Sequence, residues 1–349
     1  MVKKNLAYVL YDFHTGGMET TIYNLARHLN DEFNFHFIAT HVPKIHNKFK
    51  ELGEAAYIKD YKSLVKYYKK NNIDIVQVNI EDWYARAAKE AGVKRIVERT
   101  DGDRNCCKSS KKYVDYVIAS TNGTKKLIAK QITEKKIEVV YNGVDINIFG
   151  RGNRNRCGFS EHDIIVGRVG RLVGGKRVEL LIQALSWIGK SSDPHKKRVK
   201  LVIVGGNSKM PGAPPMKANW ERLARQLGLL NYSVIFTGDK ENPAPYINGF
   251  DICACVSNEK NEGIPNSLLE PMAARCPAIA TNVGNINELV NNENGFFVSQ
   301  NPQDIGKKIL QLCDDKLRKK MGRAARKTIE KHFNMDRMIK KYRRIYLDI

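Results

Sequence analysis

Residues 250–281, FDICACVSNEKNEGIPNSLLEPMAARCPAIAT, are the stretch of sequence that decides the fold. The stretch begins with an apolar run typical of a buried strand (250–257), passes through a polar loop into a helical pattern (267–274), and ends in a second apolar run (277–281). Parallel α/β sheets are built from such strand–helix–strand units. In these open sheets, ligands bind beyond the carboxyl ends of the strands, against helix N-termini.

Two glutamates, Glu262 and Glu270, lie on either side of the turn from this strand to this helix, with seven residues between them. A carboxylate at this position can accept hydrogen bonds from sugar hydroxyls, and the amides of the helix start favour a phosphate. A simpler interpretation exists for Glu270, because Ser267-x-x-Glu270 is also a capping box. That interpretation leaves Glu262-Gly263 unexplained, so both remain open on this stretch alone.

The alternation of short apolar runs with helical periods extends along the chain and predicts parallel sheets covered by helices. A polar, glycine-bearing span (149–156) is typical of a linker. We therefore expect an α/β protein of two doubly wound domains, residues 1–152 and 153–335, followed by an amphipathic helix (336–349). The predicted strands are 6–10, 33–39, 73–78, 95–97, 116–120 and 138–141 in the first half, and 164–169, 200–204, 234–237, 252–256 and 278–281 in the second.

Glycine-rich turns follow the first strand of each half. Gly16-Gly17 lies directly ahead of a predicted helix, and residues 167–176 read GRVGRLVGGK. Glycines let the backbone approach a ligand closely, and Arg171 and Lys176 lie where a pyrophosphate would bind. Taken singly, each feature could be a tight turn or a solvated cation. Neither turn is a G-x-G-x-x-G motif or a P-loop, which disfavours a nicotinamide cofactor, an ATPase and a kinase.

The composition is that of a globular protein, since 42% of the 349 residues are apolar and 28% are charged. No run approaches the ~18 apolar residues of a membrane span, and the run behind Met1-Val2-Lys3-Lys4 is too short for a secretory signal, so we expect a cytoplasmic protein. The 7 cysteines include no C-x-x-C pair and favour reduced thiols. No His or Cys spacing suggests zinc.

The net charge of +22 is concentrated at the C-terminus, where residues 307–349 hold 15 Lys and Arg against 5 Asp and Glu. This charge could be a solvated surface, or it could attract anionic lipid headgroups or a polyanionic acceptor. No RNP-type aromatic motif, zinc finger or basic zipper supports binding of nucleic acid.

Four separated motifs together resemble family 4 of the retaining glycosyltransferases, which have the GT-B fold. The motifs are Gly16-Gly17, Val140-Tyr141-Asn142-Gly143-Val144-Asp145, Gly170-Arg171…Lys176 and Glu262-x7-Glu270, and they occur in the family's order over nearly the whole chain. The resemblance implies two Rossmann-like domains facing across a cleft, with the sugar nucleotide held mainly by the second. It also implies that the last helix packs back on the first, acceptor-side domain.

The resemblance further implies roles for single residues. Arg171 and Lys176 would bind the diphosphate and offset the charge of the departing nucleoside diphosphate, while Glu262 would hold donor-sugar hydroxyls. Neither a cofactor nor a metal is then required. The implied donor-binding residues are Gly16 and Gly17 at the phosphates, Asn142 in its motif, Gly263, Ile264, Pro265 and Asn266 along the sugar, Ser267 at the diphosphate and Glu270 at the ribose.

One position departs from the family pattern. The family often has a histidine near the donor sugar, after a middle strand of the first domain. Here the equivalent stretch is Val97-Glu98-Arg99-Thr100-Asp101-Gly102-Asp103, so Asp101 is the nearest match. An aspartate can bind a sugar hydroxyl or orient the acceptor, but it cannot replace an imidazole donor.

The sequence therefore predicts a retaining hexosyl- or N-acetylhexosaminyltransferase. We expect it to move a sugar from a nucleoside-diphosphate donor, UDP-linked, to a glycan or lipid-linked acceptor in cell-surface polysaccharide synthesis. The basic C-terminus further suggests peripheral attachment to the anionic inner face of a membrane. Two alternatives remain open at this stage: a sugar-nucleotide epimerase of the same fold, and a non-catalytic polyanion-binding protein.

Overall fold

The computed structural model describes residues 2–13, 16–43, 45–79, 81–101, 112–130, 132, 136–150, 153–208, 212–258 and 263–347. It divides the chain into two compact units, which we call the N-terminal unit (Met1–Gly143 with Met335–Ile349) and the C-terminal unit (Val144–Asn334). Each unit is built on its own parallel sheet. The α/β class and the two doubly wound domains expected from the sequence are confirmed.

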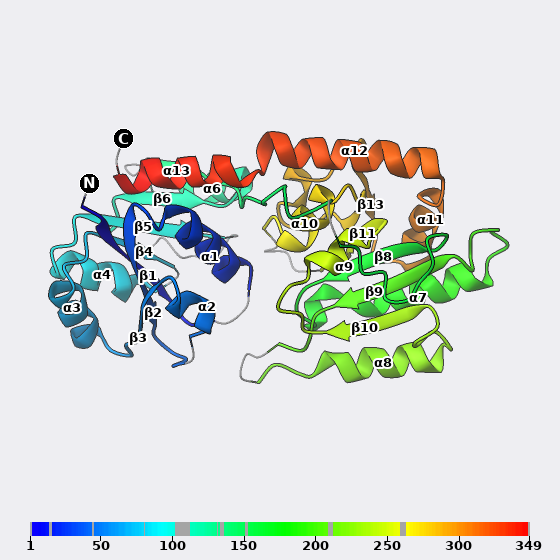
Figure 1. Ribbon diagram of the computed structural model, residues 1–349, viewed down its shortest axis with the longest axis horizontal. Helices are drawn as coiled ribbons and strands as arrows, with labels where there is room; N and C mark the ends of the chain where they lie inside the picture. The colour runs from blue at the N-terminus through cyan, green and yellow to red at the C-terminus, as the bar shows by residue number, and fades with distance from the viewer. Residues whose placement is uncertain are drawn as a thin grey trace. The chain divides into compact units, whose positions relative to one another are not determined.

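The N-terminal unit holds a seven-stranded parallel sheet with the strand order β3-β2-β1-β4-β5-β6-β7 (Figure 1). Its strands are β1 (Lys4–Leu10), β2 (Phe33–Ala39), β3 (Gly53–Tyr57), β4 (Ile75–Val78), β5 (Arg95–Thr100), β6 (Tyr116–Ala119) and β7 (Lys136–Val139). Its helices are α1 (Gly17–Leu29), α2 (Asn47–Lys50), α3 (Tyr61–Lys70), α4 (Asp82–Glu90), α6 (Asn122–Ala129) and α13 (Met335–Leu347).

Alternation along β1 shows how helices come to cover both faces of this sheet. Leu6 and Tyr8 belong to the apolar cluster that contains α1 and α13, whereas Ala7 and Val9 belong to the cluster that contains α3 and α4. Because successive side chains of a strand point to opposite faces, a continuous apolar run produces a sheet buried on both sides. The C-terminal helix α13 contacts α1 and is thereby part of this unit's core.

The C-terminal unit holds a six-stranded parallel sheet with the strand order β10-β9-β8-β11-β12-β13. Its strands are β8 (Ile164–Val169), β9 (Val199–Val204), β10 (Val234–Gly238), β11 (Ile252–Cys255), β12 (Ala278–Thr281) and β13 (Gly295–Val298). Its helices are α7 (Val178–Lys190), α8 (Met216–Gln226), α9 (Ala244–Asn248), α10 (Asn266–Ala273), α11 (Pro302–Gln311) and α12 (Asp315–His332), with short 3-10 turns η1 (Gly174–Lys176) and η2 (Ile286–Glu288).

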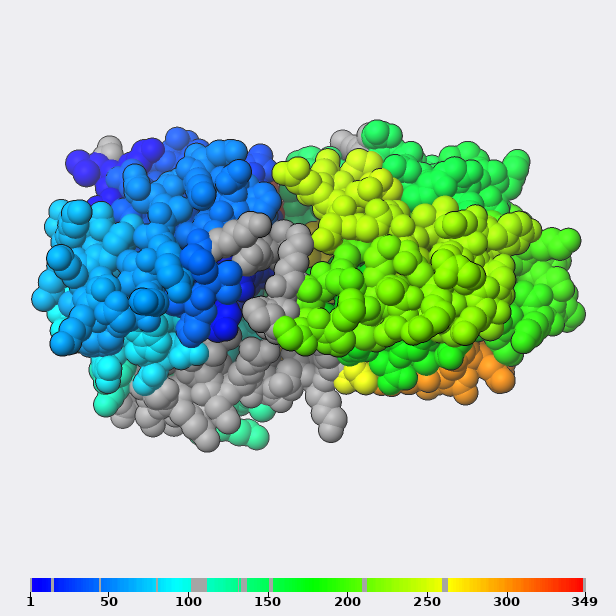
Figure 2. All heavy atoms as spheres, turned by 90° about the horizontal axis from the view of Figure 1, so that it is seen from below, coloured from blue at the N-terminus to red at the C-terminus, as the bar shows by residue number. Residues whose placement is uncertain are grey.

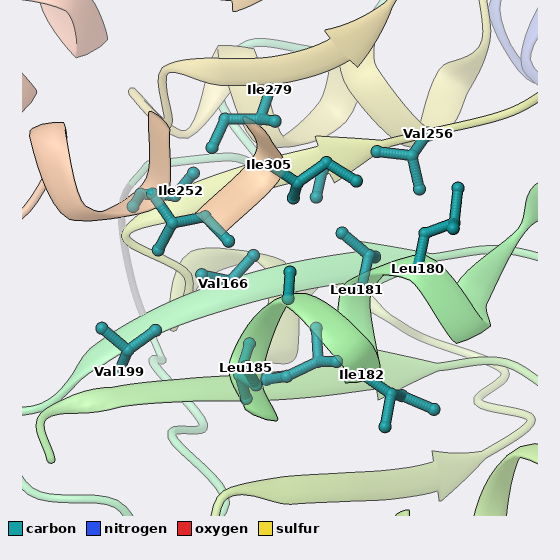
Figure 3. Close-up of a cluster of buried hydrophobic side chains, with 14 of the residues drawn as sticks. Val166, Leu180, Leu181, Ile182, Leu185, Val199, Ile252, Val256, Ile279 and Ile305 are labelled. Carbon is teal, nitrogen blue, oxygen red and sulfur yellow. The ribbon is translucent and has the colours of Figure 1, made fainter. Parts of the chain in front are cut away.

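Branched and long aliphatic side chains fill the core of this unit between the sheet and α7. Val166, Ile252 and Ile279 project from three neighbouring strands toward Leu181 of α7 and Ile305 of α11 (Figure 3). Helix α8 adds only one face to this cluster, so its other side lies on the surface that faces the viewer in Figure 2. The core fixes the strands, and with them the loops at their carboxyl ends.

The first residues of the C-terminal unit are tied to its helices. The Val144 amide donates to the carbonyl of Phe333 at 2.8 Å. The buried Arg326 of α12 donates through Nη1 to the carbonyls of Phe149 (2.9 Å) and Ala273 (2.6 Å). These bonds tie residues 144–150 to the C-terminal unit. That unit therefore begins at Val144, earlier in the chain than the start at residue 153 expected from the sequence.

The strands predicted from apolar runs are confirmed to within a few residues at their ends, but β3 and β13 were not predicted. Strand β3 (Gly53–Tyr57) lies at the edge of its sheet and has exposed or half-buried side chains, so it lacks an apolar run. Strand β13 is only four residues long and begins at a glycine. Edge strands need neither length nor an apolar pattern on both faces, so periodicity does not reveal them.

Candidate functional site

Most of the predicted site residues lie where the strand order of each sheet reverses, whereas Asp101 follows β5 and Asn142 follows β7. This switch point is between β1 and β4 in the N-terminal unit and between β8 and β11 in the C-terminal unit. Gly16-Gly17 follows β1, Arg171 and Lys176 follow β8, and residues 263–270 follow β11. In open α/β sheets, ligands bind outside the carboxyl ends of the strands at such a point.

The loop after β8 is held by a close approach of two glycines. Gly170 has φ +121° and Gly205 has φ +139°, and a Cβ on Gly205 would lie 2.2 Å from the carbonyl oxygen of Gly170. The buried Arg168 donates to the carbonyls of Gly170 (2.6 Å) and Arg171 (3.1 Å). These contacts fix the backbone at Arg171 while its side chain remains exposed.

The loops after β8, β11 and β12 are joined by hydrogen bonds. The Gly175 carbonyl accepts from Ser257 Oγ (3.1 Å) and from the Asn258 amide (2.9 Å). Thr281 Oγ1 donates to the Ser257 carbonyl at 2.5 Å. Because Gly175 precedes Lys176, the backbone that carries this lysine is anchored to the start of the loop that leads into α10.

Helix α10 begins at Asn266, after Pro265, and no side chain of the described residues caps its first turn. Ser267 is therefore already inside the helix and cannot act as the N-cap. The capping-box interpretation of Ser267 and Glu270 is thus wrong, because the N-cap is Pro265 and the helix begins two residues earlier than that motif requires. A helix start without a side-chain cap is chemically suited to an anionic group.

Glu270 lies on the second turn of α10 and is half-buried. Its carboxylate makes no hydrogen bond or ion pair with any residue that the structure describes. Burial raises the pKa of this carboxyl group from 4.5 to about 7. A carboxylate withdrawn from water without a protein donor can accept hydrogen bonds from ligand hydroxyls.

The other predicted residues of this loop are described only in part. Glu262 lies outside the described residues, so its position relative to Glu270 stays a prediction. Gly263 and Pro265 are half-buried and Ile264 is buried, which places the chain ahead of α10 against the body of the unit. The structure thus brings the loops of Arg171 and Lys176 and the start of α10 to one edge of one sheet.

In the N-terminal unit, Arg99 joins two of the predicted residues. This buried side chain is only 1% exposed. Its Nη2 donates to Asp101 Oδ1 at 2.8 Å and to Asn142 Oδ1 at 2.6 Å, and its Nε lies 3.3 Å from Asp101 Oδ2. Burial opposes the charge of Arg99, but the Asp101 carboxylate and the Tyr342 hydroxyl together outweigh burial and hold the pKa of the guanidinium above its ordinary value. Asp101 and Asn142 therefore share one buried cation.

The start of α1 is connected to the same group. Thr21 Oγ1 lies 3.0 Å from the Gly17 carbonyl and 3.1 Å from Asn142 Oδ1. A Cβ on Gly16 would lie 2.2 Å from Glu19 Oε2, whereas a Cβ on Gly17 would meet no atom within 4 Å. The Glu19 carboxylate folds over Gly16 as the end of a flexible side chain, and Gly17 leaves open space at the helix start.

Three residues of this group, Arg99, Thr21 and Tyr342, were not predicted from the sequence. Tyr342 of α13 hydrogen-bonds to Nη1 of Arg99. One signal was present, because Glu98 and Arg99 are two charged residues within a strand of the buried sheet. Nothing in the local pattern pairs Arg99 with a tyrosine 243 positions further along the chain.

Two kinds of feature are absent from the described part of the chain. Within it, no three His, Cys, Asp or Glu side chains are grouped closely enough to hold a metal ion. Also within it, no helix combines the length and the apolar content needed to cross a bilayer.

Comparison with known protein families gives two matches that together span most of the chain. The family described as "Glycosyl transferases group 1" matches residues 151–328, and the family described as "Glycosyltransferase Family 4" matches residues 15–148. The first match contains Arg171, Lys176 and Glu270, and the second contains Gly16, Gly17, Arg99, Asp101 and Asn142 but not Tyr342.

Full-length relatives and a solved structure agree with these matches. The uncharacterized glycosyltransferase MJ1069 of Methanocaldococcus jannaschii is 25% identical over 95% of both chains. The UDP-Gal:alpha-D-GlcNAc-diphosphoundecaprenol alpha-1,3-galactosyltransferase of Escherichia coli is 27% identical over 84% of this chain and 80% of that protein. The crystal structure of Anabaena Alr3699/HepE in complex with UDP-glucose matches with a TM-score of 0.81 and 17% identity, covering 99% of this chain and 100% of the other. The expected GT-B fold is confirmed.

Proposed function

This chain belongs to the group 1 glycosyl transferases, of the family 4 type, and we propose that it is a retaining enzyme that uses a UDP-sugar as donor. The proposed acceptor is a glycan or a lipid-linked sugar of cell-surface polysaccharide synthesis. The acceptor class is supported by the E. coli relative, whose name specifies a diphosphoundecaprenol-linked acceptor and a UDP-linked donor.

One observation carries the proposal for the donor site. The carbonyl of Gly175, next to Lys176, accepts hydrogen bonds from the chain directly after β11, so the glycine-rich, cation-bearing loop after β8 meets the loop that leads into α10 at one switch point. Helix α10 follows this loop, and among the described residues no side chain caps its start and none is a partner for the Glu270 carboxylate. Cations and helix amides suit a diphosphate, and a carboxylate suits the adjoining ribose hydroxyls.

The proposed chemistry follows from the charge that develops on the donor. As the bond between the anomeric carbon and the diphosphate oxygen breaks, negative charge grows on that oxygen. Arg171, Lys176 and the amides near Ser267 would stabilise this charge without rearrangement, because their backbone is already fixed. The acceptor hydroxyl would attack from the face that the diphosphate leaves, which retains the configuration of the anomeric carbon.

The remaining predicted residues take supporting roles in this proposal. Glu262 would hold hydroxyls of the donor sugar, and the backbone from Gly263 to Asn266 would line the sugar. Gly16 and Gly17 would approach the phosphates, because Gly17 leaves open space at the start of α1. Asp101 and Asn142 would bind or orient hydroxyls near the reacting carbon, since both are polar groups held by Arg99.

Release of UDP from a panel of UDP-sugars tests the proposal. Lys176→Ala and Glu262→Ala should each abolish turnover while thermal unfolding stays unchanged. Lys190→Ala, which removes the same charge from an exposed position on α7, is the matched control and should keep full activity. Equal UDP release by wild type, Lys176→Ala and Glu262→Ala would contradict the proposed donor site.

Two product measurements separate the proposed reaction from its alternatives. Proton NMR of the first product formed should show the anomeric configuration of the donor, and the inverted anomer would rule out retention. Incubation with donor alone should yield no new sugar nucleotide, whereas an epimerase would make one. The proposal also requires no metal ion, so activity should survive excess EDTA, and loss of activity that Mg²⁺ restores would contradict it.

Peripheral attachment to an anionic membrane surface is part of the proposal. Exposed cations recur along one side of α12, namely Lys316, Lys320, Arg323, Lys327 and Lys331. Such a stripe can attract anionic headgroups, with a strength that falls as salt rises. Cosedimentation with vesicles containing phosphatidylglycerol tests this part, and equal binding to neutral vesicles would exclude an electrostatic origin.

A further inference from the structure

We infer that Tyr342 of the C-terminal helix is a positioning residue of the active site, because it fixes the Arg99 guanidinium that orients Asp101 and Asn142. This inference rests on the proposed function, in which Asp101 and Asn142 act near the reacting carbon. It adds a role for α13 beyond packing. The chain's last helix then completes the site of its own N-terminal unit.

The geometry around Arg99 assigns each of its nitrogens to a partner. Nη2 binds Asp101 and Asn142, Nε lies against the second oxygen of Asp101, and Nη1 is directed to Tyr342. A guanidinium is planar, so fixing one nitrogen fixes the directions of the other donors. The hydroxyl of Tyr342 therefore sets the plane in which Arg99 presents its fork to the carboxylate.

The backbone of Arg99 is held as well. Asn79, at the end of β4, donates its Nδ2 to the Arg99 carbonyl at 2.7 Å. Arg99 lies on β5 and is almost fully buried, while the Asp101 side chain is 32% exposed. A buried, fully partnered cation beneath a partly exposed carboxylate is a suitable support for a group that contacts substrate.

A neighbouring tyrosine shows that Tyr342 has a separate role. Tyr346, one turn further along α13, is equally buried, but its hydroxyl donates to Gln77 Oε1 at 2.5 Å and lies 3.2 Å from the Tyr8 hydroxyl. No hydrogen bond joins Tyr346 to Arg99 in the described residues. The two tyrosines thus contribute similar apolar burial, and only Tyr342 binds the group that orients Asp101.

Charge explains why this hydrogen bond matters. The Arg99 guanidinium cannot lose its proton. Asp101 and Asn142 accept hydrogen bonds from its Nε and Nη2, whereas Nη1 donates to Tyr342. Removing the Tyr342 hydroxyl leaves Nη1 without this acceptor in a buried place. The guanidinium would then turn toward other acceptors, and the fork to Asp101 would lose its alignment.

Steady-state UDP release by Tyr342→Phe and Tyr346→Phe tests the inference. Both variants remove one buried hydroxyl from α13, so similar falls in melting temperature are expected. Tyr342→Phe should lower kcat about 10-fold or more, as expected for a hydrogen bond to a charged group, while the donor KM changes less than about 2-fold. Tyr346→Phe should leave both constants within about 2-fold of wild type.

A double-mutant cycle with Asp101→Asn adds a readout that a merely structural role would not move. Tyr342→Phe should have little further effect on kcat when Asp101 is already Asn, because the two residues act through the same guanidinium. Tyr346→Phe should add independently. Should Asp101→Asn leave no measurable activity, the comparison of Tyr342→Phe with Tyr346→Phe in the wild-type background decides the matter.

Three results would overturn the inference. One is an equal kcat for Tyr342→Phe and Tyr346→Phe, another is full additivity of Tyr342→Phe with Asp101→Asn, and the third is an Asp101→Asn variant as active as wild type. The proposed function fails differently, because wild type itself would then release no UDP from any donor.

Discussion

At the scale of single residues, Glu270 is the clearest sign that the C-terminal unit is built to bind a ligand. Its carboxylate is half-buried on α10, has no hydrogen-bond donor among the described residues, and has a pKa raised to about 7 by burial. Folding alone gains nothing from an ionised group in this position. We interpret the unfavourable burial as the cost of a site that becomes complete only when hydroxyls of the nucleotide bind.

The variant Glu270→Gln should stabilise the free protein at pH 8 and not at pH 4. A folded-state pKa above the unfolded value means that the native state binds more protons, so stability declines as pH rises from about 4.5 to 7 and then stays level. Allowing for partial exposure, the gain at pH 8 should be about 1–3 kcal/mol. Thermal unfolding at both pH values checks this, and an equal melting temperature at pH 8 contradicts it.

Binding of the donor should show the opposite pH dependence. If Glu270 binds the ribose as proposed, only its ionised carboxylate would accept two hydrogen bonds from it, so affinity for UDP-glucose should weaken as pH falls from 8 to 6. UDP-glucose suits the measurement because its diphosphate does not titrate in this range. In calorimetry the Glu270→Gln variant should bind more weakly at pH 8 and show a flat profile. If the affinity of the variant for UDP-glucose still changed with pH, a group other than Glu270 would be responsible for the pH dependence.

At the scale of elements, the turn after β8 depends on backbone that only glycine can supply. Gly205→Ala should cost more than about 3 kcal/mol, because its φ of +139° is disfavoured for alanine and its Cβ would meet the Gly170 carbonyl at 2.2 Å. Gly189→Ala, in α7 with open space around it, is the control and should stabilise by up to about 1 kcal/mol. Denaturant unfolding compares them, and equal stability would show that the turn relaxes freely.

Most elements were predictable because they have apolar patterns of the right period. Strands such as Phe33–Ala39 and Ile164–Val169 are rich in apolar residues, and the sequence predicts them with the same bounds as the structure. The edge strand β3 lacks that pattern, and β13 has it over only the three residues after its glycine. The Arg99 group could not be predicted, because it depends on contacts between β5, α13 and the residues after β7 that no local pattern encodes.

At the scale of the whole molecule, the chain's last helix completes the core of its first unit. Met335, Met338, Ile339, Ile345 and Tyr346 of α13 are buried in a cluster with β1 and β2. Losing buried side chains of this size costs about 2–5 kcal/mol each, so the five together contribute about 10–25 kcal/mol, as much as the whole of the roughly 5–15 kcal/mol that stabilises a typical domain.

Deleting residues 335–349 should therefore prevent the N-terminal unit from folding. We expect aggregation, or a far-UV circular dichroism spectrum that has lost about the N-terminal unit's share of signal. Deletion of residues 348–349 alone is the control and should leave the protein folded. A soluble and fully folded protein that lacks the whole helix would contradict this assignment of α13 to the core.

The central claim is that fixed cations at the switch point of the C-terminal unit stabilise the charge on the departing UDP. The most direct test measures donor affinity and single-turnover rate together for Lys176→Ala. Because catalysis needs interactions that are stronger in the transition state than in the ground state, the rate should fall about 100-fold or more while the donor Kd rises less than about 10-fold. An unchanged rate, or a rate loss no larger than the loss of affinity, would contradict the claim.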